Sequence, residues 1–224
     1  MNENEKKLDD FVDSYWNYFL ELENEFASTQ KYVAFDMSNA NTYSIEFLKL
    51  YQAVCSELDV LGKEILYHFE PDFQVDGMVT IKHWGYGITT HMCDCLSANV
   101  LFNGKIRMAP WAKFGYEQYL NKRNATCYRK VPGKKMPTWW KDYNSVKHAR
   151  TTIAEDGLIN YQLANFGNLV QAFAALYILE VFYASVLEAK ANTYEVTLNS
   201  KLFSMCFDNE ETEAETEAIM AGVM

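Results

Sequence analysis

The sequence lacks the short motifs by which many enzymes are recognised. It contains no glycine-rich phosphate loop, no G-x-S-x-G nucleophile turn and no H-E-x-x-H metal motif. It therefore gives no sign of a phosphate-loop nucleotidase, an α/β-hydrolase or a zinc protease. It also shows no internal repeat, so a repeat architecture is not expected.

Cysteine occurs in an odd number, and a secretory signal is missing from the sequence. The five cysteines are scattered, and the first residues, MNENEKKLDD, are charged and include no apolar segment. We therefore expect free thiols in a reducing cytoplasm rather than a disulfide framework.

Four residues of the middle region are of types that bind zinc: His91, Cys93, Cys95 and Cys127. The spacing His-x-Cys-x-Cys is not a common structural zinc pattern, because gaps of one residue are tight for tetrahedral ligation. The sequence leaves metal binding by these residues open, and we expect neither a metal nor another cofactor.

Long apolar runs are also scarce. The longest, residues 166–187, is interrupted by Asn168, Gln171 and Glu180. A membrane span would rarely carry such groups, so this stretch predicts a buried core helix and no membrane partner.

The chain contains enough apolar residues for one large domain, and its charge is distributed unevenly. Hydrophobic residues make up 49% and aromatic residues 15%, which predicts a sizeable core. The net charge is −10, yet residues 105–150 hold 12 basic residues against two acidic ones. A local positive field attracts phosphates even on an acidic protein, so residues 105–150 are the candidate surface for RNA or a nucleotide.

Hydrophobic periodicity predicts long helices. Apolar residues recur at three- and four-residue steps over 8–33, 44–69 and 160–190. Ser44 is the expected N-cap of the second helix, Pro71 follows its end, and Thr138 can cap a short helix through Arg150. Residues 76–92 are read either as a poor helix weakened by glycine or as irregular structure.

Other parts of the chain predict strands and loops. Asn103-Gly104 lies between apolar runs, and this dipeptide favours a hairpin because both turn positions need positive φ. Residues 111–137 are read as a basic, aromatic loop, and residues 194–207 as an ambiguous segment with strand-like alternation. Residues 208–224 are expected to form an acidic, disordered tail.

Together these patterns predict a mainly α fold. We expect a bundle of long antiparallel helices, with a partly β, basic insertion between the second and the last helix pairs. A single helical domain then spans residues 1–207, with its insertion at about 73–136.

The stretch WWKDYNSVKHAR, residues 139–150, concentrates side chains that can bind a ligand. On a helical wheel, one arc carries its large aromatic and hydrogen-bonding groups, and such a surface can stack a base and pair a phosphate. With neighbouring bases, the ligand-binding candidates are Lys147, Tyr143, Trp139, Trp140, Lys134, Lys135, Arg129 and Lys130.

The same stretch has a purely structural interpretation. Trp140 and Tyr143 can be core residues that pack against residues 44–69 or 160–190, since their exposure would be costly. Asn144 and His148 would then face a cleft beside amide groups of the last helix, which need hydrogen-bond partners.

Charged residues of the second helix can support the stretch. Asp59 and Lys63 are an i,i+4 pair by default, and Lys147 or Arg150 can pair with a half-buried carboxylate of that helix. The supporting candidates are Glu57, Asp59, Lys63, Asn165 and Asn168.

The chain resembles a largely uncharacterised group of bacterial and phage-associated proteins with a WWxxYNxxKHxR motif, similar to the HEPN-like helical superfamily. The segments that carry the resemblance are WWKDYNSVKHAR, LANFGNLVQAFAALYILE (163–180) and NTYSIEFLKLYQAVCSELDVLGKE (41–64). The resemblance covers residues 10–70 and 137–190. It implies a helical fold that often dimerises and that, in many members, acts as a metal-independent ribonuclease in phage defence.

The sequence departs from the catalytic motif of these ribonucleases. That motif is an arginine, four to six residues and then a histidine, whereas here His148 precedes Arg150. If the protein is nevertheless an enzyme, its candidate catalytic residues are His148, Arg150 and Asn144. Non-catalytic members act as binding or assembly modules.

We therefore expect a nucleic-acid- or nucleotide-binding protein in phage–host conflict. The first alternative is a non-catalytic module that binds a protein partner or forms a homodimer, with the basic insertion neutralising its own acidic helices. The second alternative is a metal-independent ribonuclease. An exposed basic groove would favour binding, whereas a basic insertion docked on acidic helices would favour the interaction module. His148 in an open cleft, facing its copy across a dimer, would favour the ribonuclease.

Overall fold

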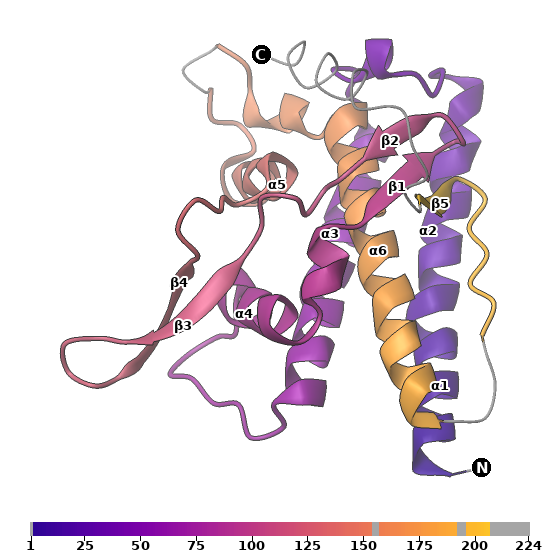
Figure 1. The fold of residues 1–224 in the computed structure, drawn as a ribbon. Coiled ribbons are helices and arrows are strands. Elements are labelled where there is room, and N and C mark those ends of the chain that lie inside the picture. The colour runs from indigo at the N-terminus through magenta and orange to yellow at the C-terminus, as the bar shows by residue number, and fades with distance from the viewer. Residues whose placement is uncertain (1, 154–156, 192–195, 207–224) are drawn as a thin grey trace.

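A computed structural model of the chain describes residues 2–153, 157–191 and 196–206. Its helices are α1 (Glu3–Phe11), a π-helical segment (Val12–Trp16), α2 (Asn17–Ser28), α3 (Ile45–Phe69), α4 (Ile81–His91), α5 (Thr138–Ala149) and α6 (Phe166–Ala191). Its strands are β1 (Asn99–Phe102), β2 (Ile106–Met108), β3 (Tyr116–Leu120), β4 (Thr126–Lys130) and β5 (Phe203–Cys206). Figure 1 shows their arrangement.

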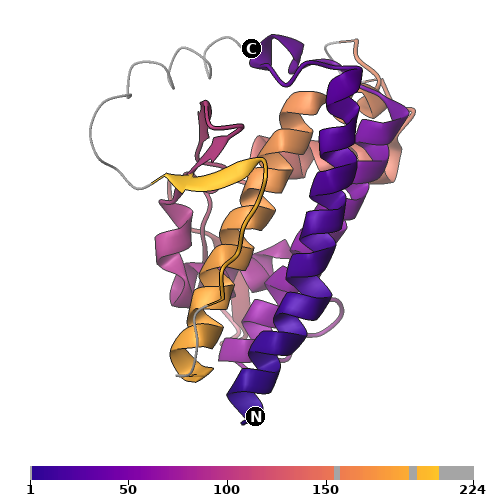
Figure 2. The ribbon, with the colours of Figure 1, turned by 90° about the vertical axis from the view of Figure 1, so that its right-hand side faces the viewer.

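Three long helical elements form one side of the molecule. The α1–α2 element, continuous through its π-helical segment, lies beside α6, and α6 also packs against α3 (Figures 1 and 2). The mainly α class is therefore confirmed. The finer expectation of a bundle made of long helix pairs is not confirmed, because α5, with 12 residues, is much shorter than its neighbour α6, with 26.

The boundaries of the first and last helices differ from the prediction by several residues, and the first helical element ends at Ser28 rather than near 33. The first helix begins at Glu3, where Asn2 forms a capping box with Glu5. Ser44 caps α3 as predicted, through its side chain and the Phe47 N–H. The last helix begins at Phe166 rather than near 160, because residues 160–163 form a 3-10 turn.

The predicted cap of α5 was wrong by one position. Thr138 is the first helical residue, and Pro137 is the N-cap, with no side-chain hydrogen bond. Proline at this position lacks the N–H that an N-cap would leave unpaired, and its fixed φ suits the entry to a helix.

The hairpin predicted at Asn103-Gly104 is confirmed. Strands β1 and β2 pair antiparallel, and the two turn residues have φ values of 52° and 66°. The other edge of β1 pairs with β5, so the three-stranded sheet has the order β2-β1-β5. The ambiguous segment 194–207 thus contains a strand, but at Phe203–Cys206; residues 194 and 195 and the predicted tail from 208 lie outside the described residues.

A second hairpin was missed. Residues 111–137, expected as a loop, contain β3 and β4, which pair from Tyr116↔Lys130 to Leu120↔Thr126. Most of the side chains on these strands are exposed or half-buried, so the sequence carries little of the alternation that marks a half-buried strand.

The core is dominated by rings, and the predicted insertion contributes several of them. One cluster surrounds Phe26 of α2, whose ring centroid lies 4.6 to 6.3 Å from five others: Phe35, Phe47, Phe102, Phe166 and Phe173. Phe102 comes from β1, so the middle of the chain is built into the core rather than attached to it.

Two glycines allow close packing between helices and strands. A Cβ atom on Gly62 of α3 would lie 2.7 Å from the Trp84 ring of α4, and one on Gly85 would lie 2.6 Å from the Phe114 ring. Residues 76–92 therefore contain a well-packed helix, because the glycines that weaken it locally admit neighbouring aromatic rings.

We expect Gly62→Ala to lower the free energy of unfolding by about 1 to 2 kcal/mol, although alanine favours helix by about 1 kcal/mol. The Trp84 ring is fully buried, and its Nε1 donates to Asp59 Oδ1 at 3.0 Å, so it cannot move aside freely. Chemical denaturation measures the change. Ser56→Ala, at an exposed position of α3, is the control and should not destabilise; an equal effect of both substitutions would contradict this packing account.

Candidate functional site

The two tryptophans that open WWKDYNSVKHAR belong to a buried cluster of four. Trp139 lies 5.3 Å from Trp111, and Trp140 lies 5.5 Å from Trp84, each pair edge to face. Trp84 and Trp111 also contact each other, at 6.4 Å. All four rings are at most 5% exposed.

Hydrogen bonds fix this tryptophan cluster to the surrounding helices. The Tyr51 hydroxyl on α3 donates to the carbonyl of Trp139, and Trp111 Nε1 donates to the carbonyl of Ala175 on α6 at 3.0 Å. Trp139 and Trp140 therefore cannot stack on a ligand, and their place among the ligand-binding candidates is corrected.

Tyr143 is also a packing residue. Its ring lies 5.9 Å from the Tyr51 ring, and burial, followed by the nearby Cys55 and Asp59, raises the pKa of Tyr143 to about 12. Lys147 Nζ lies 5.4 Å from the centroid of the same ring. Tyr143 packs against residues 44–69, as the structural interpretation stated, and its ring is not available to stack on a nucleobase.

The three residues implied as catalytic do not form a site together. Asn144 Nδ2 donates to the Trp140 carbonyl of its own helix at 2.9 Å. His148 and Arg150 are exposed, and no hydrogen bond or ion pair joins the three side chains within the described residues. Asn144 and His148 were expected to face a cleft beside the last helix. Instead, another residue of α5, Asp142, contacts α6 directly, since Asn168 Nδ2 donates to Asp142 at 3.0 Å.

The other supporting residues have local partners. Asp59 pairs with Lys63, as the default i,i+4 interpretation stated, and not with Lys147 or Arg150. Asn165 accepts from the Asn168 N–H at 2.9 Å, which caps the start of α6. Glu57 is half-buried, and burial raises its pKa.

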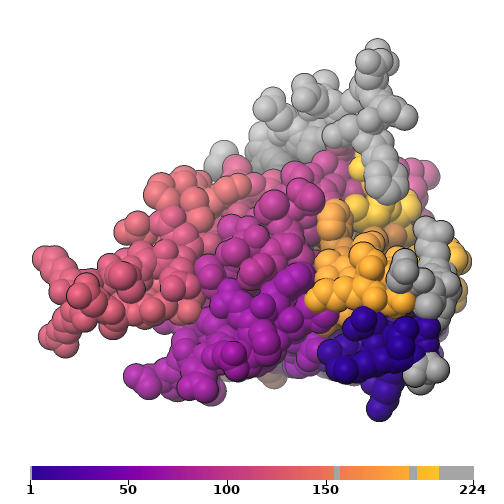
Figure 3. Space-filling model, turned by 60° about the horizontal axis from the view of Figure 1, so that its bottom comes forward, coloured from indigo at the N-terminus to yellow at the C-terminus, as the bar shows by residue number. Residues whose placement is uncertain are grey.

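The basic residues of 105–150 have a different environment from the buried aromatic residues described above. All of them except Arg107 are exposed. Many lie on the β3–β4 hairpin and the segment that follows it, which project from the body on the side away from α1 and α2 (Figures 1 and 3). The exposed set is Lys105, Lys113, Lys122, Arg123, Arg129, Lys130, Lys134, Lys135, Lys141, Lys147 and Arg150.

The β3–β4 hairpin has contacts at its middle and at its tip. Midway along β4, the Tyr128 ring packs against Phe73, His83 and Tyr86. At its tip, Asn121 Oδ1 accepts from the backbone N–H groups of Arg123 and Ala125, at 2.8 and 3.1 Å. The tip therefore presents Lys122 and Arg123 on a defined turn.

Arg129 differs from the other exposed basic side chains of residues 105–150. Its Nε donates to Glu117 Oε1 at 2.8 Å, and its guanidinium lies 4.7 Å from the centroid of the Tyr119 ring. Within the described part of the chain, no other exposed base of residues 105–150 forms an ion pair. Arg129 thus stabilises the hairpin, while Lys130 and Lys135 remain available to an anion. Lys134 Nζ donates to the Ala112 carbonyl at 3.4 Å.

The potential zinc ligands have other surroundings. His91 contacts Glu70 at 3.1 Å and stacks on Phe69, Cys95 is buried, and Cys127 accepts from Asn121 Nδ2 at 3.4 Å. Across the described residues, no group of three or more His, Cys, Asp or Glu is arranged to hold a metal ion.

Helix α6 is the one helix in the described ranges that is long and apolar enough to cross a membrane by length and composition. Of its most apolar window, 72% is buried inside the protein, which is compatible with the core helix of a soluble protein.

Helices α3 and α6 bring together a group of polar residues that no sequence pattern had indicated as a site. His68, Tyr183 and Lys190 form a hydrogen-bonded chain, and Glu180 is fully buried nearby. Glu180 was visible as a charge inside an apolar run, but it was treated only as evidence against a membrane span. The other three gave no sequence signal, because His68 is separated from them by more than a hundred residues.

Comparison with protein-family models, with curated proteins and with solved structures finds no match.

Proposed function

We propose that this protein binds a nucleic acid through phosphate contacts made by the β3–β4 hairpin and the lysines that lead into α5. The observation that carries the proposal is the set of exposed lysine and arginine side chains on a projecting hairpin and the segment after it, of which only Arg129 has a carboxylate partner among the described residues. The phosphates of an extended nucleic-acid strand can be contacted by basic side chains that are spread along a projecting hairpin.

The distribution of charge supports the proposal. Residues 3–28, which include α1 and α2, hold eight acidic residues and two basic ones, and they lie on the opposite side of the molecule from the hairpin (Figure 1). The basic hairpin therefore lies away from these two acidic helices, which favours polyanion binding over the protein-interaction alternative. Such a separation orients the molecule with its hairpin towards a polyanion.

The burial of the tryptophans narrows the mode of binding. Because Trp111, Trp139 and Trp140 are in the core, they cannot supply the base stacking of single-strand binding proteins. Recognition then depends on charge, and affinity should depend steeply on salt. If six phosphates are contacted on a single strand, the log–log slope should be about −4.

The ribonuclease alternative gains no support from α5, because Asn144, His148 and Arg150 do not converge. We place nucleic-acid binding in the cytoplasm and in phage–host conflict as part of the same proposal, on the resemblance described above.

The proposal is tested by replacing the two basic side chains at the hairpin tip. We expect Lys122→Gln with Arg123→Gln to weaken RNA or DNA binding about tenfold at low salt and to make the single-strand slope shallower by about 1.4. Electrophoretic mobility shift across salt concentrations measures both quantities. The control is Lys6→Gln with Lys31→Gln, which removes the same charge from exposed positions on the acidic side.

Comparison of the two variants distinguishes the effect of contacts made by the hairpin from the effect of the protein's net charge. Equal weakening by both would show that only total charge matters, and it would overturn the assignment to the hairpin. Failure of the parent protein to bind any RNA or DNA at low salt would remove the proposal altogether.

A further inference from the structure

A second candidate site lies at the end of the molecule where α1, α3 and α6 meet. A half-open cavity of about 520 Å³ lies between them, a volume typical of small-molecule sites. Rings of Phe11, Tyr15, Tyr67 and Tyr183 form part of its wall. Residues 105–150 contribute nothing to its lining, so the cavity is separate from the basic surface.

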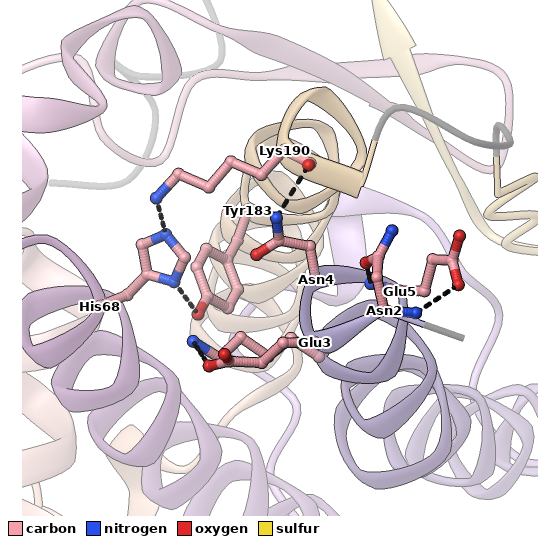
Figure 4. A network of polar contacts seen from close by, with 8 residues as sticks. Asn2, Glu3, Asn4, Glu5, His68, Tyr183 and Lys190 are labelled. Atoms are coloured by element: carbon pink, nitrogen blue, oxygen red, sulfur yellow. Dashed lines mark hydrogen bonds and ion pairs between the residues drawn. The ribbon is translucent and has the colours of Figure 1, made fainter.

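One wall of the cavity carries a chain of hydrogen bonds with a fixed direction. Lys190 Nζ contacts His68 Nε2 at 2.5 Å, and His68 Nδ1 contacts the Tyr183 hydroxyl at 3.2 Å (Figure 4). An ammonium group can only donate, so Nε2 must accept and the imidazole proton must lie on Nδ1. His68 then donates to the Tyr183 hydroxyl, whose pKa is raised by burial and then by the charge of the nearby Glu64.

The cavity is lined by two cations, Lys7 and Lys190, and by two carboxylates, Asp10 and Glu64. Lys7 Nζ is already paired with Glu3 Oε1 at 3.2 Å, so Lys190 is the cation left for a ligand. The pKa of His68 is lowered by burial and then by the nearby charges of Lys190 and Lys7. The side chain of Asn4 donates to the backbone carbonyl of Lys190 at 3.0 Å, which ties α1 to the end of α6 (Figure 4). Lys190 contacts no carboxylate within the described residues, so its charge is available to a ligand.

The acidic end lies around Tyr15. Burial and then the charges of Glu64, Glu57 and Glu180 raise the pKa of Tyr15 to about 12. Tyr15 and Ser14, which both line the cavity, belong to the π-helical segment Val12–Trp16. Such segments are rare and are frequently found at functional sites.

We propose that this cavity binds a small zwitterion, whose anionic group lies at the Lys190 end and whose ammonium group lies at the Tyr15 and Glu64 end. A ligand with only one sign of charge would satisfy one end and oppose the other. The tyrosine rings add favourable faces for the ammonium group, since cations are attracted to aromatic faces.

The test uses three probes of matched length: ε-aminocaproate, which carries both charges, n-hexylamine and hexanoate. Binding to the full chain is followed by the nuclear magnetic resonance signals of the His68 and Tyr183 rings. We expect saturable shifts with ε-aminocaproate and affinity at least about tenfold weaker for either singly charged probe.

Two variants locate the two ends of the ligand. Lys190→Met and Glu64→Gln should each weaken ε-aminocaproate binding about tenfold, because each removes one charge from the cavity. Both positions are exposed, so folding should be retained. Lys6→Met and Glu21→Gln make the same changes at exposed positions outside the cavity and should leave binding unchanged.

Each other outcome rejects the proposal. Equal affinity for n-hexylamine would show a simple cation site, and equal affinity for hexanoate a simple anion site. Absence of saturable shifts with all three probes would show that the cavity is not a site for such ligands. Nucleic-acid binding should be the same in Lys190→Met as in the parent, so this test and that of the hairpin fail independently.

Discussion

Replacing Glu180 with glutamine is expected to stabilise the protein by about 3 kcal/mol near neutral pH, which corresponds to roughly 5 to 10 °C in melting temperature. The side chain of Glu180 on α6 is fully buried, and neither carboxylate oxygen has a hydrogen-bond partner among the described residues. Glutamine has the same shape but no ionisable group. The substitution therefore removes the cost of burying a charge without opening a cavity.

The stabilisation should depend on pH in a defined direction. Burial, and then the charge of Glu57, raises the pKa of Glu180 well above its ordinary value of 4.5. The folded state then keeps a proton that the unfolded chain has released, so the free energy of unfolding falls as pH rises from 4.5 towards the raised pKa. The fall is up to about 1.4 kcal/mol per pH unit.

Thermal unfolding of parent and variant at several pH values checks this prediction. At about pH 4, both states of the parent carry the proton, and the two proteins should differ little. The difference should then grow with pH. Glu21→Gln, at an exposed position of α2, is the matched control and should show no such growth; a Glu180→Gln variant that is less stable than the parent near neutral pH would show that the carboxyl has a stabilising partner.

The same substitution at Glu23 is expected to have the opposite sign, with a loss of about 2 to 3 kcal/mol. Glu23 on α2 is also fully buried, but its carboxylate accepts three hydrogen bonds. The donors are the Ser200 hydroxyl and the backbone N–H groups of Lys201 and Leu202, the last two at 3.0 Å. Glutamine would turn an amide group towards donors and leave at least one of them unpaired.

Two measurements check the prediction at Glu23. The melting temperature should fall by roughly 5 to 10 °C, and amide hydrogen exchange should accelerate in β5, which follows the anchored segment directly. Glu21→Gln again serves as the control. An unchanged exchange rate in β5 would contradict the role of Glu23 as the anchor of this strand.

Local features of the fold could be predicted, because their causes lie within a few residues. Ser44 caps its helix through an N–H three residues away, and Asn103-Gly104 supplies the positive φ values of a tight turn. The β3–β4 hairpin could not be found in this way, since most of its side chains are exposed and it is anchored by a ring contact between Tyr128 and α4.

The nature of the WWKDYNSVKHAR helix could be predicted only in part. The helical wheel placed its large groups on one arc, but it could not say that Trp84 and Trp111 would cover the tryptophans. The arc is divided by burial: Trp140 and Tyr143 lie in the core, whereas Lys147, His148 and Arg150 are exposed. The basic segment was located correctly as a surface, because a cluster of unpaired lysines is costly to bury.

The anchoring of β5 bears on when the protein can finish folding during its synthesis. Phe203 packs on Phe19 and pairs with β1, and Glu23 on α2 finds its partners some 177 to 179 positions later. Until the ribosome has made residue 206, the apolar face of α2 lacks part of its cover and Glu23 lacks its donors. Contacts of such long range form late and slowly, so the nascent chain must keep its first helix soluble while almost all of the remaining sequence is translated.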